Sequence, residues 1–465
     1  MPRPLIDLVE LVSKLTRQRW FFGKIVMPRK AKVEESKILR RPRGMHDILP
    51  ADYPFWERLE RVAGELADFY GFNRLETPIL EFAVLYEKGS GETTDIVQKE
   101  MYVLRTKGGD WLALRPEFTP GVMRAYVEHG FSRLPQPQKF YSRGPVFRHE
   151  SPQAGRFREF HQLNFEIIGG QSDPVYDAQA VVIAHRLLEE LRLKNVLLRV
   201  NSLGCKVCRP AYRRQLQNYY RGLERKICSD CNRRLKTNPL RLLDCKEERC
   251  QEFKSQAPNI LDKLCATCSS NFRAVLEYLD EVGIPYILDN QLVRGLDYYN
   301  RTVFELSLED TGSELGALVA GGRYDYLMEM LGWRQTPAVG FAAGAERIIE
   351  AMKIRGIKLP TRGEKRVFLV YIGSLAKKKI LRLMEDLRRA NISVAESLGR
   401  ESLRAQLKTA DKEGFELALI LGHKEVFEER VIIRDLRKSL QETVSWSKLV
   451  EEVRKRLRAA GDEER

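Results

Sequence analysis

The sequence predicts a multidomain protein of mixed helix and strand content that ends in a small α/β domain. Its 465 residues exceed the size at which a single hydrophobic core stops growing, so two to four domains are expected. Strand-like and helix-like periodicities alternate over roughly the last 100 residues. All eight cysteines fall between Cys205 and Cys268, which indicates an inserted segment of different character.

The main domain is expected to begin near Arg41 with a long amphipathic helix. Between Asp52 and Phe69 apolar residues recur at spacings of three and four, and Gly71 suits a helix stop. Residues 205–285 are Cys-rich, basic and helical, whereas Leu318–Ile349 returns to a core-like composition. The other elements expected here are the strands Leu112–Leu114 and Val196–Val200 and the helix Arg209–Leu223.

The C-terminal domain, residues 365–465, follows a predicted linker at residues 353–364 that contains Gly356, Pro360 and Gly363. Its alternating periods imply a sheet of its own. The expected elements are the strands Val367–Ile372, Ile392–Ala395, Glu416–Leu421 and Arg430–Arg434 and the helices Leu375–Ala390, Ser402–Lys412 and Ser447–Leu457.

The N-terminal residues 1–38 form a basic extension with little patterning. Met27 opens a second plausible start, so the preceding residues are expected to be an optional extension. The apolar stretch Leu5–Val12 is too short to span a membrane and is interrupted by acidic residues. No run of 18 apolar residues exists, and the expected compartment is therefore the cytoplasm, with no membrane partner.

The chain carries a net charge of +15, from 79 Lys and Arg against 64 Asp and Glu. Such a balance favours a polyanionic partner, nucleic acid above all, because Lys and Arg release counterions from phosphates. A basic surface that only aids solubility is the alternative at this point.

Five separated segments combine charged residues with aromatic residues, prolines or glycines. Arginine offers a planar fork to phosphate and phenylalanine a stacking face to adenine. The two prolines around Glu117 predict a rigid, non-helical mount for a carboxylate. Each segment alone also fits a surface ion pair, a turn or ordinary packing. The segments are Arg115–Pro120, Phe147–Glu150 with Arg156–Phe160, Leu292–Glu305, Ala320–Asp325 and Gly340–Arg347.

Together these segments resemble the class II aminoacyl-tRNA synthetases and, within that class, the histidyl family. The similarity covers residues 41–460, in order and at sensible spacing. The class motifs 1, 2 and 3 are matched by Glu76–Pro78, by Phe147–Glu150 with Arg156 and Phe160, and by Gly344–Arg347. The segments that resemble histidyl signatures are Arg43–Asp47, Leu292–Tyr299 and Ala320–Asp325.

The resemblance implies an α+β catalytic domain with a central antiparallel sheet over residues 39–352, followed by an anticodon-binding domain. It also implies a homodimer that activates L-histidine with ATP to histidyl-adenylate and pyrophosphate, and then transfers histidine to the 3′-terminal adenosine of tRNA(His). ATP is then a substrate and arrives with Mg²⁺.

The resemblance also implies which residues bind ATP. Arg148 would hold the α-phosphate and the histidine carboxylate, and Arg294 would approach that phosphate from the opposite side, where other class II enzymes place a metal ion. Both would act as catalytic cations, fixed where charge develops. Glu150 and Phe160 would recognise adenine, Arg347 would stack on adenine and bind the γ-phosphate, and Arg156 would hold the pyrophosphate end.

A histidine pocket beside the phosphates is implied in the same way. The matching acidic and hydroxyl side chains suit an ammonium group and an imidazole, because an apolar substrate would leave them unpaired. For Tyr298 and Tyr299, ordinary packing in the core is the alternative to a role in this pocket. The residues implied, besides Arg148 and Arg294, are Glu117, Phe118, Thr119, Gln162, Glu166, Tyr298 and Tyr299.

The cysteines form four close pairs, three of them with Cys-x₂-Cys spacing. In a cytosolic protein such pairs favour a metal site over disulfides, and two of them can enclose a tetrahedral Zn²⁺. The favoured ligands are Cys228, Cys231, Cys265 and Cys268, with Cys245 and Cys250 as competitors. Catalysis in the family does not require zinc, so this ion is expected to be structural.

Three other functions compete with the ligase. The first is a regulatory paralogue from histidine biosynthesis, which shares the catalytic fold but lacks the anticodon domain. The second is a synthetase-like module that senses uncharged tRNA inside a larger regulator; no kinase segment accompanies it here. Another class II specificity, such as threonyl or prolyl, is disfavoured by the Leu292–Tyr299 run.

Overall fold

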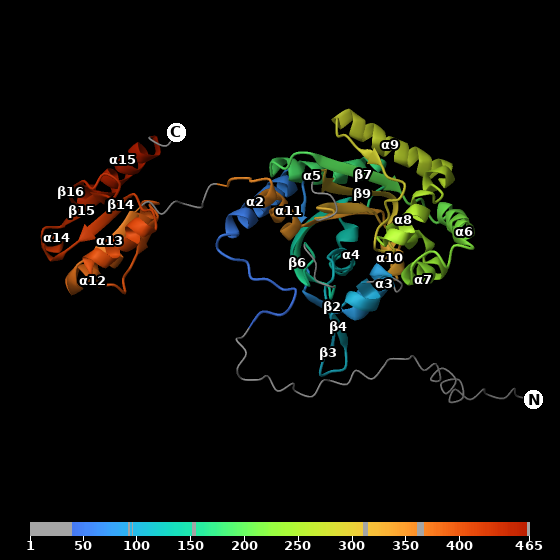
Figure 1. Cartoon of the computed structure of the whole chain (residues 1–465), viewed down its shortest axis with the longest axis horizontal. Helices are drawn as coiled ribbons and strands as arrows, with labels where there is room; N and C mark the ends of the chain where they lie inside the picture. The colour runs from blue at the N-terminus through green and yellow to red at the C-terminus, as the bar shows by residue number, and fades with distance from the viewer. Residues whose placement is uncertain are drawn as a thin grey trace, which may run out of the picture.

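A computed structural model describes residues 40–91, 94, 96–150, 155–309, 315–359 and 367–462. The expected extension at residues 1–38 and the second start at Met27 lie outside these residues. The strands form sheets of eight, three and five strands (Figure 1). None of the described helices is both long and apolar enough to cross a lipid bilayer.

The eight-stranded sheet has the order β1-β5-β6-β11-β10-β9-β7-β8. Its six central strands pair antiparallel, whereas β1 and β8 add parallel to the two edges. The predicted central antiparallel sheet is therefore confirmed. Its strands are β1 (Asn73–Arg74), β5 (Gln138–Phe147), β6 (Glu159–Ile168), β7 (Val196–Ser202), β8 (Ile287–Leu288), β9 (Asn300–Leu308), β10 (Val319–Arg323) and β11 (Ala338–Gly344).

One face of this sheet is covered by long helices. Their buried apolar residues form one cluster with Phe165 of β6, Phe304 of β9 and Phe341 of β11. The predicted amphipathic helix is confirmed, and Gly71 follows its end with φ +73°, as expected of a helix stop. The helices are α2 (Tyr53–Phe69), α5 (Pro174–Glu190), α9 (Ala266–Val282) and α11 (Ala345–Ile354).

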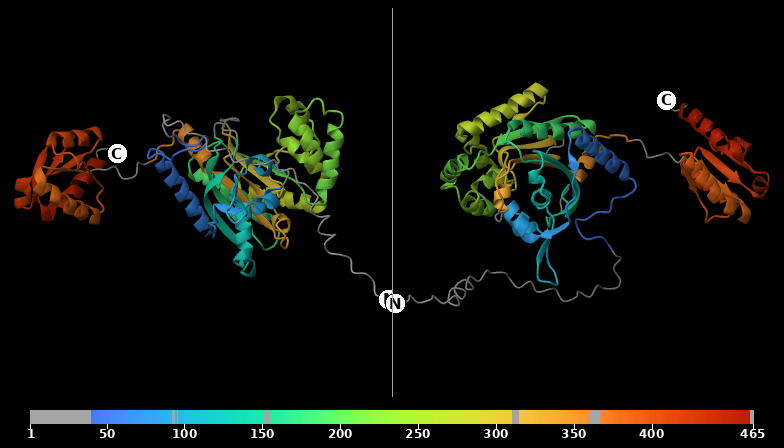
Figure 2. Two further views of the ribbon diagram at one scale, coloured as in Figure 1. Left: turned by 90° about the horizontal axis from the view of Figure 1, so that it is seen from below. Right: turned by 180° about the vertical axis from the view of Figure 1, so that it is seen from behind.

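The opposite face carries α4 (Thr119–Glu128) and the helices that follow β7. Phe118, Val122 and Tyr126 pack there with residues of the insertion, such as Tyr212 and Leu216. Figure 2 shows these inserted helices as one group in both views. They are α6 (Cys208–Tyr220), α7 (Ser229–Thr237), a 3₁₀ helix at Pro239–Asp244 and α8 (Glu248–Ser255), so the expected helix Arg209–Leu223 is confirmed in α6.

A small antiparallel sheet lies before α4, with the order β2-β4-β3. The strand predicted at Leu112–Leu114 is confirmed within β4. Short helices flank this region and the end of β10. The elements are β2 (Leu80–Phe82), α3 (Ala83–Ser90), β3 (Val103–Arg105), β4 (Trp111–Leu114) and α10 (Leu327–Met330).

The C-terminal domain has its own five-stranded sheet in the order β13-β12-β14-β15-β16. All seven predicted elements are confirmed within a few residues, whereas α14 and β16 were not predicted. Helix α11 runs to Ile354, inside the segment expected as a linker. The elements are β12 (Val367–Tyr371), α12 (Gly373–Arg389), β13 (Val394–Glu396), α13 (Leu403–Lys412), β14 (Leu417–Leu421), α14 (His423–Phe427), β15 (Arg430–Asp435), β16 (Gln441–Ser445) and α15 (Leu449–Asp462).

Candidate active site

A cavity of about 460 Å³ lies on the large sheet, on the side away from its long helices. Its size suits a small-molecule ligand. Strand alternation places Gln162, Asn164 and Glu166 of β6 on this face, while Phe165 points into the core on the other side. The structure brings twelve of the predicted residues into its wall: Glu117, Thr119, Arg148, Glu150, Arg156, Phe160, Gln162, Glu166, Arg294, Tyr298, Tyr299 and Arg347.

Arg148 directly follows β5 and is fixed from two sides. Its Nε donates to the Pro116 carbonyl at 2.9 Å, and its guanidinium carbon lies 5.5 Å from the Phe160 ring centre. Beyond it, Glu150 and Arg156 form an ion pair at 3.1 Å, in which the Arg156 side chain is more than a third exposed. This end of the cavity therefore holds two cations and one aromatic face.

Arg294 lies in the loop before β9 and is ion-paired with Glu305. Its guanidinium carbon lies 5.6 Å from the Tyr299 ring centre. Burial disfavours its charge, but Glu305 and the neighbouring acidic groups together outweigh this effect, and the pKa of Arg294 is raised. Among the described residues its buried Nε has no hydrogen-bond partner.

Arg347 reaches the cavity from the first turn of α11. Its Nε and Nη1 each donate to a backbone carbonyl at 3.0 Å, those of Gly155 and Ala317. Burial lowers the pKa of Arg347, and the positive charges of Arg156 and Arg148 lower it further. Cations that disfavour one another in a shared cavity create a site for a polyanion such as a phosphate chain.

Glu117 is buried and accepts hydrogen bonds from two hydroxyl groups. Ser90 Oγ donates to its Oε1 and Tyr298 Oη to its Oε2, both at 2.6 Å. Burial raises the pKa of Glu117. The two hydrogen bonds and the charges of Arg148 and Arg294 lower it, but by less than burial raises it. A ligand cation beside it would stabilise the ionised form.

Glu166 is the second buried carboxylate of the cavity. Thr119 Oγ1 donates to its Oε1 at 2.6 Å, Asn164 Nδ2 donates to the same oxygen at 3.3 Å, and Tyr324 Oη donates to its Oε2. Burial raises the pKa of Glu166 to about 7, and the charge of Glu117 contributes to the rise. A Cβ on Gly340 would lie 1.8 Å from Oε2, so only glycine leaves room for this carboxylate.

The segment Arg115–Pro120 differs from its prediction in two respects. Helix α4 begins at Thr119 with Pro120 in its first turn, so the expectation of a non-helical stretch was wrong there. Proline is tolerated at this position because N–H groups of the first turn have no helical partner. The Phe118 side chain, expected in the histidine pocket, is fully buried in the core, with the Arg115 guanidinium 4.1 Å from its ring centre.

Three residues of the hydrogen-bond network were not predicted as site residues: Ser90, Asn164 and Tyr324. Asn164 was accessible to sequence reasoning, because it alternates with Gln162 and Glu166 along one strand face. Tyr324 belongs to the Ala320–Asp325 run. Ser90 ends α3, and no sequence pattern indicates that it meets Glu117.

The cysteines form a different arrangement from the predicted one. Two separate groups of four occur among the described residues, each with ligand atoms within 4.8 Å of one another: Cys205, Cys208, Cys265 and Cys268, and Cys228, Cys231, Cys245 and Cys250. The predicted set of Cys228, Cys231, Cys265 and Cys268 was therefore wrong. The reason is the fold: the start of α9 returns to the end of β7, next to Cys205, while the other four stay within the insertion.

Comparison with known proteins agrees with this architecture. The histidyl-tRNA synthetase family model matches residues 44–348, and the anticodon-binding domain model matches residues 366–456. The histidine–tRNA ligase of Desulforamulus reducens is 43% identical to this chain, over 89% of this chain and 98% of its own length. That of Dehalococcoides mccartyi is 42% identical, over 90% of this chain and 100% of its own length. The apo histidyl-tRNA synthetase of S. aureus is 31% identical, with a TM-score of 0.74 over 89% of this chain and 99% of its own. The chain belongs to the histidyl-tRNA synthetase family.

Proposed function

We propose that the chain is a histidine–tRNA ligase, which activates L-histidine with ATP and then transfers it to the 3′-terminal adenosine of tRNA(His). The observation that carries this proposal is the cavity itself. Arginines from three distant segments, Arg148, Arg294 and Arg347, line it together with two buried carboxylates, Glu117 and Glu166.

The arginines suit the first step. A histidine carboxylate oxygen attacks the α-phosphorus of ATP, and pyrophosphate leaves. Arg148 and Arg294, which both line the cavity, would stabilise the charge that develops on the α-phosphate. Arg347 and Arg156 would hold the outer phosphates, and Phe160 and Glu150 the adenine. Mg²⁺ would enter with ATP as part of the substrate.

The carboxylates suit the amino acid. Glu117 would bind its ammonium group, with Thr119 and Gln162 beside it, and Glu166 would accept a hydrogen bond from the imidazole. Tyr298 and Tyr299 would close the pocket, with ring centres 4.6 Å apart. In the second step, a hydroxyl of the terminal adenosine attacks the histidyl carbonyl carbon and AMP leaves.

We further propose a homodimer in the cytoplasm that binds tRNA through its C-terminal domain and its basic surface. The small β2-β4-β3 sheet supports a dimer, because it exposes large apolar side chains next to the Glu76–Pro78 segment. These are Leu80, Phe82, Val103, Leu104 and Trp111 of the sheet, together with Ile79 directly before β2. The regulatory paralogue is not favoured, because the anticodon-binding domain is present.

The test is histidine-dependent exchange of pyrophosphate into ATP by the purified chain. We expect exchange with L-histidine and none with threonine or proline, because only histidine offers both an ammonium group and an imidazole N–H to the two buried acids. Charging of tRNA(His) transcripts tests the second step. No exchange with histidine under any condition would identify a binding protein instead.

A further inference from the structure

We propose that the chain holds two structural zinc ions, each in its own site of four cysteines. Site 1 consists of Cys205, Cys208, Cys265 and Cys268, and site 2 of Cys228, Cys231, Cys245 and Cys250. This inference rests on the cysteine geometry alone and is independent of the proposed catalytic function.

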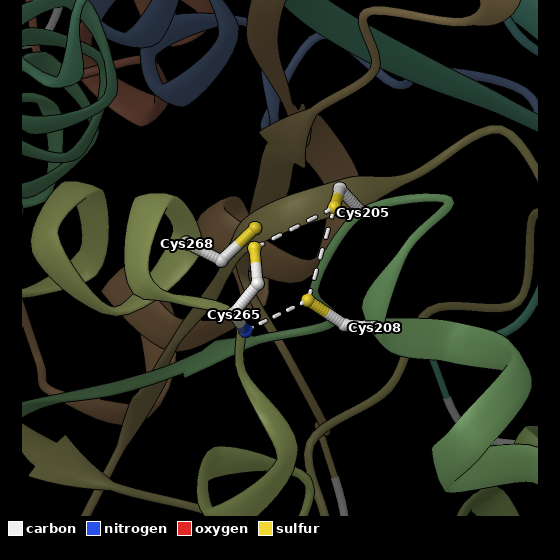
Figure 3. A group of neighbouring side chains, drawn as sticks. All are labelled: Cys205, Cys208, Cys265 and Cys268. Carbon is white, nitrogen blue, oxygen red and sulfur yellow. Dashed lines mark hydrogen bonds between the residues drawn. The ribbon is translucent and has the colours of Figure 1, made fainter.

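Site 1 joins the central sheet to the insertion and to α9. Figure 3 shows its four side chains converging from two segments that are distant in the sequence. Cys205 Sγ lies 3.7 Å from Cys208 Sγ and 3.9 Å from Cys265 Sγ. A Cβ on Gly204 would lie 2.7 Å from the Cβ of Cys208, so the glycine permits the close turn that brings the first two ligands together.

Site 2 lies wholly within the insertion, and all four of its cysteines are buried. Cys228 Sγ lies 3.8 Å from Cys245 Sγ. Cys228 precedes the first residue of α7, Cys250 lies in α8, and Cys245 follows the 3₁₀ helix between them. Three short helices thus meet at one point.

The sulfur spacing fits tetrahedral zinc. Zn–S bonds of about 2.3 Å in a tetrahedron place the sulfurs about 3.8 Å apart. The observed separations of 3.7, 3.8 and 3.9 Å agree with this spacing and are far too long for a disulfide, whose S–S bond is about 2.05 Å. An iron–sulfur cluster would place several metal and sulfide atoms between the cysteines and would need wider spacing.

Backbone amides complete both sites. The N–H of Cys265 donates to Cys208 Sγ at 3.1 Å, and that of Val207 to Cys205 Sγ at 3.4 Å. In site 2, the N–H of Cys231 donates to Cys228 Sγ at 3.3 Å, and that of Cys228 to Cys250 Sγ at 3.2 Å. Such donors stabilise thiolate ligands, which a Zn²⁺ ion requires, and orient them.

Site 2 also anchors one wall of the catalytic cavity. Cys245 lies between Asp244 and Lys246, and both of these line the cavity. In the same segment, Arg241 Nη1 donates to the Gly295 carbonyl at 3.1 Å, next to Arg294. A metal at site 2 therefore holds the chain that supports the Arg294 loop.

The test is the metal content of the full-length chain, expressed in medium with equal zinc and iron and measured by plasma mass spectrometry. We expect two zinc ions per chain. X-ray absorption at the zinc edge should then show only sulfur ligands, at about 2.3 Å. One or no zinc ion per chain, iron in either site, or nitrogen and oxygen ligands would overturn the proposal.

Matched variants distinguish the two sites from the ligand set predicted by sequence spacing. Cys208→Ser should remove one zinc ion by opening site 1, and Cys245→Ser one by opening site 2, while the double variant retains none. If the Cys208→Ser variant still binds two zinc ions per chain, the ligand set proposed for site 1 is wrong. The wild-type measurements do not depend on how well these variants fold.

Discussion

Replacing Glu166 by glutamine should stabilise the unliganded catalytic domain, and more so at high pH. Burial raises the pKa of Glu166 to about 7, whereas an unfolded glutamate titrates near about 4.3. A group with a raised folded pKa adds stability that is full below the unfolded pKa and is lost as the pH rises through 7. The titration of Glu166 therefore destabilises the domain progressively from the unfolded pKa up to about pH 7, and glutamine removes the effect.

The magnitude follows from the two pKa values. Each tenfold difference in proton affinity corresponds to about 1.4 kcal/mol. Between the two pKa values the unfolded chain ionises while the folded one stays protonated, so the titration of Glu166 lowers the unfolding free energy by about 1 kcal/mol at pH 5 and by about 3.6 kcal/mol at pH 8. With an unfolding entropy of about 2.1 cal/mol/K per residue over about 300 residues, about 3.6 kcal/mol corresponds to about 6 °C in Tm.

Differential scanning calorimetry of the full chain at pH 5 and pH 8 measures this difference. Packing changes caused by glutamine affect both pH values equally, so the pH dependence of the Tm difference isolates the ionisation. The control is Glu65→Gln, in an exposed i,i+4 ion pair of α2, which should change little at either pH. If Glu166→Gln raises the Tm equally at both pH values, or raises it more at pH 5, the reasoning is refuted.

Three further substitutions test separate contacts. Arg294→Ala should lower histidine-dependent pyrophosphate exchange by about 100-fold or more, with modest loss of histidine affinity, because it would remove the charge proposed to stabilise the α-phosphate. Unchanged turnover would contradict that role. Gly340→Ala should raise the KM for histidine and lower the unfolding free energy by about 2 kcal/mol, because the added Cβ would collide with the Glu166 carboxylate. Wild-type values in urea unfolding and in the exchange assay would contradict this. Arg323→Met should lower the unfolding free energy in urea by about 3–5 kcal/mol, because the buried Asp177 loses its partner at 2.9–3.0 Å. Adding Asp177→Asn should restore part of this stability, whereas an additive loss in the double variant would argue against the pairing.

The C-terminal domain could be predicted almost completely because its central strands are apolar throughout. All residues of Val367–Tyr371 and of Leu417–Leu421 are buried, as expected for strands covered on both faces. Strand β16 was missed for the opposite reason. It is the edge strand, and Gln441–Ser445 buries only Val444, so neither period nor composition indicates a strand.

The cysteine arrangement shows where sequence spacing stops being informative. A Cys-x₂-Cys spacing brings two sulfurs together, because the intervening turn is local. Which pairs share a metal depends instead on where distant segments meet. Cys265 donates its backbone N–H to Cys208 because the chain returns from the insertion to the end of β7 before α9 begins. That return is a property of the tertiary fold, and no spacing encodes it.

The partners of the two buried acids explain why the cavity suits histidine. Glu117 and Glu166 accept hydrogen bonds mainly from neutral hydroxyl groups, and burial raises the pKa of both. Neither acid has a cation within ion-pair distance among the described residues, so the unliganded site carries the electrostatic cost of burial. A ligand with an ammonium group and an imidazole N–H would relieve that cost at both positions, whereas an apolar amino acid would relieve it at only one. Selectivity in the proposed reaction therefore follows from keeping these two carboxylates unpaired until the substrate binds.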